Sequence, residues 1–463
     1  MTTLTTTRRG FLKSGSLGAL ALVLAERRAP AAPEKRPPNI LFMHTDQQHW
    51  EALSAFGCAH VRTPAMDRLT AAGTSFSLSY SANPVCCPAR TCWYTGRASQ
   101  ENGVIMNDAW PIAPDMPDLG QWFGARGYDA VYGGKWHVTG RQFTKSFRVI
   151  TPGTGIGELS DASVARAAEG FLRARQAGDK PFFLNLGFLQ PHDCCYWVFE
   201  HQGDEPRTRL GPPPELPPLP ANFAHPATEP HLLAQRREKK TWSAEQWRWY
   251  LWNYYRMVEM ADAAVGRVLD ALEDAGLAQE TLVVLTADHG DGLARHGLTS
   301  KMFLYDEAAR VPFIAAWPGQ LQAGRRDERH LVTGLDVAPT LCAFAGFAPP
   351  PKMRGLSLRP LLEGRDTTPW REFIVSDTHG TGRMVRTPEY KYIAYRDDPV
   401  TQLFDMRADP GELQNLATTA AQSGVVRDLA GRLDAWERTL DRLPLQEPQP
   451  SARPRKNKQR KQA

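Results

Sequence analysis

Four segments of the chain share one pattern, in which a nearly continuous apolar run ends in polar residues and a helix-like stretch follows. These segments are residues 39–48, 128–137, 181–193 and 281–291. Apolar runs without alternation are typical of strands buried on both faces, as in parallel sheets covered by helices. Helical composition and periodicity mark stretches between them, at 63–73, 116–127 and 242–277. The pattern therefore predicts an α/β fold with a mostly parallel central sheet flanked by helices.

The C-terminal part of the chain has a different pattern. Short strand-like runs at 372–377, 383–396 and 401–406 precede a helical stretch from about 422 to 440. Short strands in close succession favour antiparallel pairing. We therefore expect a large domain over residues 37–369 and a smaller C-terminal α+β subdomain over 370–445. A proline-rich stretch at 211–220 is either a surface linker or a wall of the functional site.

The net charge of +5 comes from the two ends of the chain. Residues 1–36 carry seven basic and two acidic side chains, and residues 451–463 carry six basic and no acidic ones. From totals of 55 and 50, this leaves 42 basic and 48 acidic side chains in between. The body is slightly acidic, so no nucleic-acid partner is expected, and the basic end at 446–463 indicates a disordered tail.

Residues 1–32 have the pattern of an export signal. Paired arginines lie within 6–13, a short apolar run follows at 14–25, and small residues at 29–32 offer a cleavage site. The apolar run is shorter than the about 20 residues that span a bilayer, so no transmembrane helix is expected. A short buried helix is the alternative. The pattern predicts a twin-arginine signal peptide, the twin-arginine export machinery as a partner, and a periplasmic or secreted location.

Polar side chains stand where the four predicted strands end, and such ends gather ligands at one edge of a parallel sheet. They are Asp46, Lys135, His137, His192, Asp288 and His289. Carboxylates and an imidazole suit a divalent cation. Basic side chains beside a cation, with Arg90 and Lys301 added, would bind and stabilise a sulfate or phosphate ester.

Five motifs occur in order: "CCPAR" at 86–90, "GGKWH" at 133–137, "TADHGD" at 286–291, "LTSKMFLYDEAARVPFI" at 298–314, and "TPEYKYIAY" with "QLFDMRADPGELQNLA" at 387–417. With these motifs, the chain from residue 39 to about 417 resembles the formylglycine-dependent (type I) sulfatases of the alkaline-phosphatase-like superfamily. The resemblance implies a sulfuric ester hydrolase with an alkaline-phosphatase-like fold. Residues 37–369 would then form its catalytic domain.

The resemblance implies that Cys86 is oxidised to formylglycine (3-oxoalanine) by a formylglycine-generating enzyme. The hydrated aldehyde offers one hydroxyl that attacks sulfur and a second whose deprotonation expels the sulfate. Asp46, Asp288 and His289 would bind one divalent cation together with residue 86. Ca²⁺ is the first choice, with Mg²⁺ or Mn²⁺ as alternatives. Gln47, where many members carry an acid, would contact either the metal or the substrate.

The other matched residues take the family's remaining roles. Arg90 would position the diol, and Lys135 and His137 would contact it, with His137 as the base for sulfate elimination. His192 and Lys301 would bind the ester and assist the leaving oxygen. Ala89 replaces the serine that often precedes the motif arginine, although the C-x-P-x-R pattern itself is intact.

The resemblance implies sulfated glycans or other small sulfate esters as substrates. The alternatives are a formylglycine-dependent phosphodiesterase or phosphonate monoester hydrolase, and a catalytically dead glycan-binding protein. Four tryptophans at 242–252 form either core or a sugar-stacking surface, and helical spacing favours core. Linkage, exo or endo action and oligomeric state do not follow from the sequence.

The seven cysteines are an odd number, so at least one cannot pair within the chain. Cys87 is expected to be a small buried neighbour of Cys86. Cys194 and Cys195 are adjacent and have no counterpart in the family pattern. Their partners stay open, with the remaining three cysteines as candidates, Cys58, Cys92 and Cys342.

Overall fold

The computed structural model describes residues 36–153, 155–200, 215–238, 241–365 and 369–444. The expected signal peptide at 1–32 and the expected tail at 446–463 lie outside these residues, and the domain boundaries stay predictions. In this described part, no helix combines the length and the apolar character needed to cross a bilayer.

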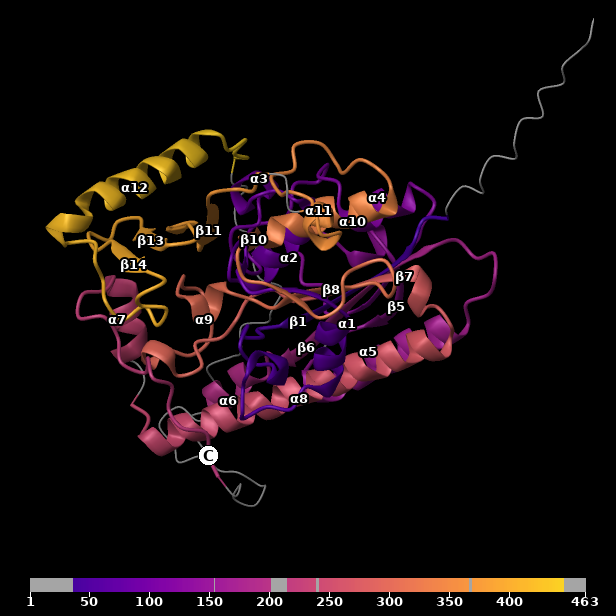
Figure 1. Cartoon of the computed structure of the whole chain (residues 1–463), viewed down its shortest axis with the longest axis horizontal. Coiled ribbons are helices and arrows are strands. Elements are labelled where there is room, and N and C mark those ends of the chain that lie inside the picture. Colours follow the sequence, from indigo (N-terminus) through magenta and orange to yellow (C-terminus); the bar gives the residue numbers. More distant parts are fainter. Residues whose placement is uncertain (1–35, 154, 201–214, 239–240, 366–368, 445–463) are drawn as a thin grey trace, which may run out of the picture. The chain divides into compact units, whose positions relative to one another are not determined.

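An eight-stranded sheet lies at the centre of residues 37–444 (Figure 1). Its strands, in spatial order, are β5 (Arg148–Pro152), β4 (Asp129–Gly134), β6 (Phe182–Pro191), β1 (Asn39–Asp46), β7 (Thr281–Ala287), β8 (Phe313–Ala316), β2 (Gly73–Phe76) and β9 (Arg325–Asp327). The first five are parallel, and β8 runs antiparallel to both of its neighbours. The predicted α/β fold with a mostly parallel sheet is confirmed.

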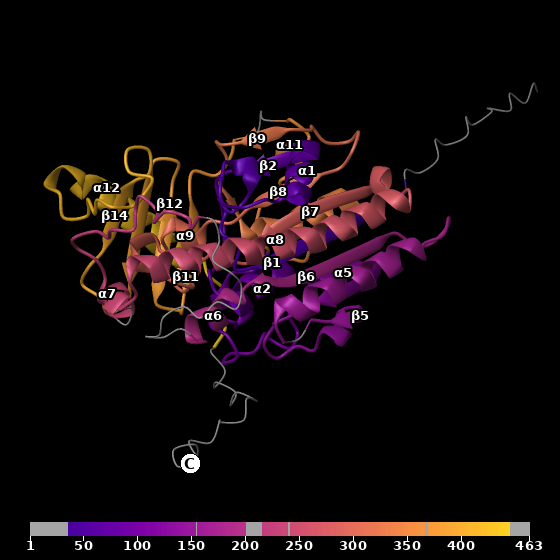
Figure 2. The same ribbon diagram turned by 90° about the horizontal axis from the view of Figure 1, so that it is seen from below.

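Helices cover both faces of this sheet, which explains the unbroken apolar runs. Ile40 and Phe42 of β1 pack in one core cluster, and Leu41 and Met43 pack in another on the opposite face. The first face is covered by α2 (Cys86–Thr95), α4 (Leu119–Gly124), α10 (Val337–Ala345) and α11 (Arg359–Leu362). The second is covered by α1 (Pro64–Ala72), α5 (Gly157–Arg173) and α8 (Ala244–Asp274). Figure 2 shows α5 and α8 running side by side.

A second sheet near the C-terminus is antiparallel throughout. Its order is β11 (Ile374–Thr378), β12 (Gly382–Arg386), β13 (Tyr390–Tyr395) and β14 (Gln402–Asp405). Val385 and Leu403 face α12 (Ser423–Arg438), whereas Met384 and Phe404 pack with residues of the large body such as Tyr305. This two-sided burial matches the short strand-like runs of the sequence.

Short elements complete the fold. They are β3 (Ser79–Tyr80), paired with β10 (Val332–Thr333), and the helices α3 (Ser99–Asn102), α6 (Cys194–Glu200), α7 (His231–Glu238) and α9 (Asp306–Ala309). Single 3-10 turns lie at Ser54–Phe56, Phe143–Lys145, Ala278–Glu280, Arg295–Gly297, Gly334–Asp336 and Ala420–Gln422.

A buried ionic cluster joins the second sheet to the large body. Lys391 of β13 places its Nζ 2.5 Å from Asp306 Oδ1, at the start of α9, and 2.7 Å from Glu412 Oε1. The Asp306 amide in turn donates to Glu412 Oε2 at 2.6 Å. Burial and the neighbouring Asp306 raise the pKa of Glu412 to about 7, against the attraction of Lys391. Two acids thus share one lysine.

The tryptophans of 242–252 divide into two pairs. Trp242 and Trp247 are buried in a cluster with Tyr250, so the core interpretation is confirmed for them. Trp249 and Trp252 are only half-buried, with ring centroids 5.7 Å apart.

Candidate active site

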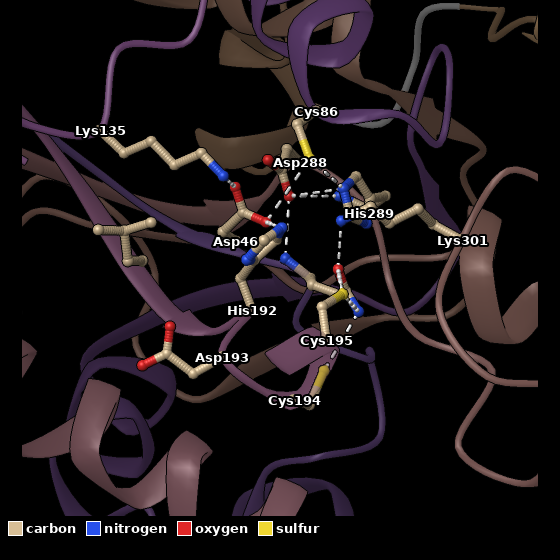
Figure 3. A network of polar contacts seen from close by, with 12 residues as sticks. Asp46, Cys86, Lys135, His192, Asp193, Cys194, Cys195, Asp288, His289 and Lys301 are labelled. Atoms are coloured by element: carbon tan, nitrogen blue, oxygen red, sulfur yellow. Dashed lines mark hydrogen bonds and ion pairs between the residues drawn. The ribbon is translucent and has the colours of Figure 1, made fainter. Parts of the chain in front are cut away.

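The ends of the parallel strands place the sequence-selected polar residues around one point. Asp46 ends β1, Lys135 and His137 follow β4, His192 follows β6, and Asp288 and His289 follow β7. Cys86 begins α2 at the same place. Figure 3 shows the side chains of Asp46, Lys135, His192, Asp288 and His289 gathered there, with Cys86 and Lys301 beside them.

Four of these residues form a group with the dimensions of a metal site. One ligand atom each from Asp46, Cys86, Asp288 and His289 lies within 4.8 Å of the other three, and all four side chains are buried. Cys86 Sγ lies 3.1 Å from His289 Nε2 and 3.8 Å from Asp46 Oδ1. His289 Nδ1 faces the Gly290 carbonyl at 2.9 Å, which leaves Nε2 as the ligand atom. Two carboxylates and an imidazole fit a divalent cation.

Arg90 connects the two acids of this group. Its Nε lies 2.9 Å from Asp288 Oδ2, its Nη2 lies 2.9 Å from Asp46 Oδ2, and its Nη1 donates to the Lys135 carbonyl at 2.8 Å. Burial opposes ionisation of Asp46, yet Lys135, His192 and Arg90 hold its pKa well below the usual range. Burial and the nearby Asp46 raise the pKa of Asp288. The guanidinium therefore offsets the repulsion between two neighbouring carboxylates.

The start of α2 explains the "CCPAR" motif. Pro88 falls in the first helical turn, where its missing N–H costs no helical hydrogen bond. The N-terminal end of a helix also favours negative charge at Cys86. Burial and Asp46 would raise the pKa of this thiol, but Lys301 and Lys135 bring it well below its usual value. Residue 86 thus occupies a positively charged environment.

A cavity of about 1110 Å³ opens next to this buried group. Lys135, His137, His192 and Lys301 line it, whereas Cys86 is fully buried beside it. His192 Nε2 lies 4.0 Å from Asp46 Oδ1. Basic side chains therefore line the cavity next to the candidate metal ligands.

His137 lies beside residue 86 as well. Its Nε2 is 3.4 Å from Asp108 Oδ1, and one ligand atom each of His137, Asp108 and Cys87 lies within 4.8 Å of the others. Burial alone would lower the His137 pKa, but Cys87 and Asp108 raise it well above its usual value. Cys87 is buried in the core cluster under α2, as expected.

Gln47 lies between the metal-ligand group and the cavity. Its backbone N–H donates to Asp288 Oδ1 at 3.0 Å, and its side-chain carbonyl accepts a hydrogen bond from Lys301 Nζ. Its Nε2 lies 2.6 Å from Asp291 Oδ2 and 3.2 and 3.3 Å from the Sγ atoms of Cys194 and Cys195. Gln47 therefore orients Lys301, and its contact with metal or substrate stays a prediction.

Cys194 and Cys195 line the cavity as free thiols. All seven cysteines of the chain are free. None of the pairings considered from the sequence is present. Asp291 is the functional residue that sequence analysis missed, although it closes the "TADHGD" motif. It accepts hydrogen bonds from Tyr250, Leu293, Ser300 and Gln47, and so holds the cavity wall together.

A buried layer behind Arg90 was also missed. His44 Nδ1 lies 3.2 Å from Arg90 Nη1, and His44 Nε2 lies 3.0 Å from Asn185 Oδ1 and 3.2 Å from Tyr94 Oη. His44 lies inside an apolar run, so its side chain gave no sequence signal beyond a lone polar residue in a strand.

Both parts of the chain match known proteins. Residues 38–347 match the Sulfatase family, and residues 294–439 match the family N-sulphoglucosamine sulphohydrolase, C-terminal. The chain is 31% identical over 435 residues to a Delta 4,5-hexuronate-2-O-sulfatase of Bacteroides thetaiotaomicron, covering 88% of this chain and 90% of that protein.

Solved structures share the architecture. A 2-O GAG sulfatase superimposes with a TM-score of 0.74 at 28% identity, covering 87% of this chain and 92% of that one. A phosphonate monoester hydrolase of Agrobacterium radiobacter superimposes with a TM-score of 0.73 at 22% identity, covering 90% of this chain and 100% of the other. At that identity the second likeness concerns the fold alone.

Proposed function

Because the chain belongs to the sulfatase family and is a sulfuric ester hydrolase, we propose that it removes sulfate from sulfated glycans through a formylglycine at residue 86 and a divalent cation. One observation carries the proposal. Cys86 stands at the N-terminal end of α2, grouped with Asp46, Asp288 and His289, beside a cavity lined with basic side chains.

The size and charge of the cavity support a sulfated sugar as substrate. Ligand cavities commonly measure about 300 to 1,000 Å³, and this one reaches about 1110 Å³, which leaves room for a sugar beyond the sulfate group. Two of the relatives named above act on sulfated hexuronate or glycosaminoglycan substrates. Small sulfate esters stay an alternative within the same class.

The residues present fit the two groups that the family requires. Asp46, Asp288, His289 and residue 86 would hold the cation, for which we propose Ca²⁺ ahead of Mg²⁺ or Mn²⁺; when bound, it polarises the sulfate oxygens. Formylglycine, once hydrated, supplies the attacking hydroxyl and a second hydroxyl that permits release of sulfate.

The chain's own residues do the rest. Arg90 and Lys135 keep Asp46 ionised, so that it can serve as a ligand. Lys301, oriented by Gln47, offsets negative charge on the sulfate oxygens. His137 lies beside residue 86, where it can accept a proton, and His192 lines the cavity, where it can donate one to the leaving oxygen.

Maturation and export are part of the proposal. A formylglycine-generating enzyme would modify Cys86, and the twin-arginine machinery would carry the chain to the periplasm or beyond the cell. The paired-arginine pattern within residues 1–32 supports this route.

Mass spectrometry of the peptide that carries Cys86 tests the nucleophile, using chain produced together with a formylglycine-generating enzyme. We expect an aldehyde at residue 86 that a hydrazine reagent traps, absent in Cys86→Ala and present in the matched control Cys87→Ala. Unmodified Cys86, in a host that modifies a known sulfatase, would contradict the proposal. Aryl sulfate should be hydrolysed faster than an aryl phosphodiester; the reverse order would indicate the phosphodiesterase alternative.

A further inference from the structure

Arg236, in the last turn of α7, lines the cavity without an acidic partner among the described residues. Its Nη1 donates to the Met302 carbonyl at 3.1 Å, and its guanidinium carbon lies 5.6 Å from the centroid of the Phe303 ring. The carbonyl and the ring carry only partial negative charge. Arg236 therefore differs from a cation held in an ion pair.

Three other cations of this region are held in ion pairs, whereas Lys301 is held by the side-chain carbonyl of Gln47. Arg90 binds Asp46 and Asp288, and Lys135 binds Asp46. Arg237, the next residue on α7, forms a two-pronged ion pair with Glu229. Arg236 thus differs from Arg237, an adjacent residue of the same type that has a carboxylate partner.

The groups that face Arg236 from other elements are neutral. Tyr395 ends β13, and His379 follows β11. Burial lowers the pKa of His379, and the charge of Arg236 lowers it further, which keeps the imidazole neutral. Burial also lowers the pKa of Arg236 itself. A partly buried cation without an anion is unfavourable, so this position favours an anion that arrives from outside.

We propose that Arg236 binds a second anionic group of the substrate, separate from the sulfate ester that is hydrolysed. This inference rests on the proposed function, because it assigns the rest of the substrate in the same cavity. The guanidinium fork binds two oxygens of a planar carboxylate, and it also binds the oxygens of a sulfate group. Arg236 is anchored to Met302, the residue after Lys301, so one substrate can contact both cations.

Two sources supply such a group: the carboxylate of an acidic sugar, or a second sulfate on a neutral sugar. The experiment therefore compares three substrates, a monosulfated neutral hexose, a monosulfated hexuronate and a disulfated neutral hexose. Each is assayed with the full, matured chain and with Arg236→Gln. Arg166→Gln, an exposed arginine of α5, is the matched control.

The measured quantity is the ratio of kcat/KM for each dianionic substrate to that for the neutral monosulfate. We expect Arg236→Gln to lower this ratio roughly 10- to 100-fold, the loss expected for a charge-assisted hydrogen bond. Arg236→Lys should recover part of it, and Arg166→Gln should leave it unchanged. A fall for the hexuronate identifies a carboxylate, and a fall for the disulfate identifies a second sulfate.

Unchanged ratios, with all three substrates affected equally, would overturn the inference. The melting temperature of Arg236→Gln distinguishes a role in substrate binding from a role in folding. Removal of a cation that has no ion pair should not lower the melting temperature. If no substrate is hydrolysed, the proposed function has failed, but calorimetric titration of the hexuronate and the neutral monosulfate still decides the role of Arg236. Equal binding of both by the wild-type chain and Arg236→Gln would overturn it.

Discussion

The Arg90 guanidinium lies between the ends of β1 and β7 and binds the carboxylate at each of them. Its place in the sequence, four residues after Cys86, puts it one helical turn further along α2. The motif spacing thus has a structural reason. Cys86 and Arg90 share one face of a helix that points at two strand ends.

Single residues differ in how well the sequence identifies them. Asp46 and Asp288 could be predicted because each follows a buried strand whose end has a known direction. Asp291 could not, because its partners come from α8 and from the loop at Ser300. Arg236 gave no signal either, since a buried and an exposed arginine look alike within a charged segment.

Lys301 lines the cavity next to the candidate metal ligands, so its charge should affect turnover. Lys301→Ala should lower kcat for an aryl sulfate by about 10²- to 10³-fold, because it removes a positive charge aimed at the sulfate oxygens. The control is Lys352→Ala, an exposed lysine whose partner is Asp441. Steady-state kinetics of both variants check the prediction. Equal kcat in Lys301→Ala and the wild type would contradict it.

Strand β13 ties the second sheet to the large body through Lys391 and its two acids. Short apolar runs in close succession made these strands predictable, and adjacent apolar residues pack against different layers on the two faces of the sheet. The order of the strands in the eight-stranded sheet could not be predicted from the sequence. The three strands that follow β7 in spatial order, β8, β2 and β9, are only three or four residues long and carry little pattern.

Glu412 makes the stability of this junction depend on pH. Its pKa is about 7 in the folded chain, above the ordinary 4.5, so the folded state binds the proton more tightly. Protonated Glu412 contributes about 3 kcal/mol to the free energy of unfolding. This contribution is complete below pH 4.5 and is lost as the pH rises through 7. Urea unfolding at pH 5 and pH 8 should show this loss in the wild type, and Glu412→Gln should lack it. Parallel pH dependence in both chains would refute the assignment.

For the whole molecule, the site is a product of topology. Its residues come from strands β1, β4, β6 and β7 and from the loop that carries Lys301, and they meet because parallel strands end at one edge. This convergence could be predicted from pattern alone. The cavity beside it could not, because its walls include α6 and α7, whose packing depends on contacts distant in sequence.

Metal binding should therefore stabilise the entire fold. Treatment with a chelator is expected to lower the melting temperature. Adding Ca²⁺ at 100 times its Kd should then raise the free energy of unfolding by about 2.7 kcal/mol. Asp46→Asn should abolish the shift, because it removes a ligand at the end of β1. Asp270→Asn, an exposed acid paired with Arg68, should retain it. Calorimetric scans with Ca²⁺, Mg²⁺ and Mn²⁺ compare the ions, and identical melting with and without any of them would exclude a structural contribution of metal.

For the proposed maturation of Cys86, the complete burial of this residue would limit the time available to the modifying enzyme. Such an enzyme would have to reach the thiol before α2 packs against the sheet and His289 contacts it. The two residues are 203 positions apart, so synthesis at about 5–20 residues per second leaves about 10 to 40 seconds between them. A chain that folds before Cys86 is modified could then no longer acquire the formylglycine. The fraction of active protein would then depend on the rate of modification of Cys86 relative to the rate at which the chain folds around it.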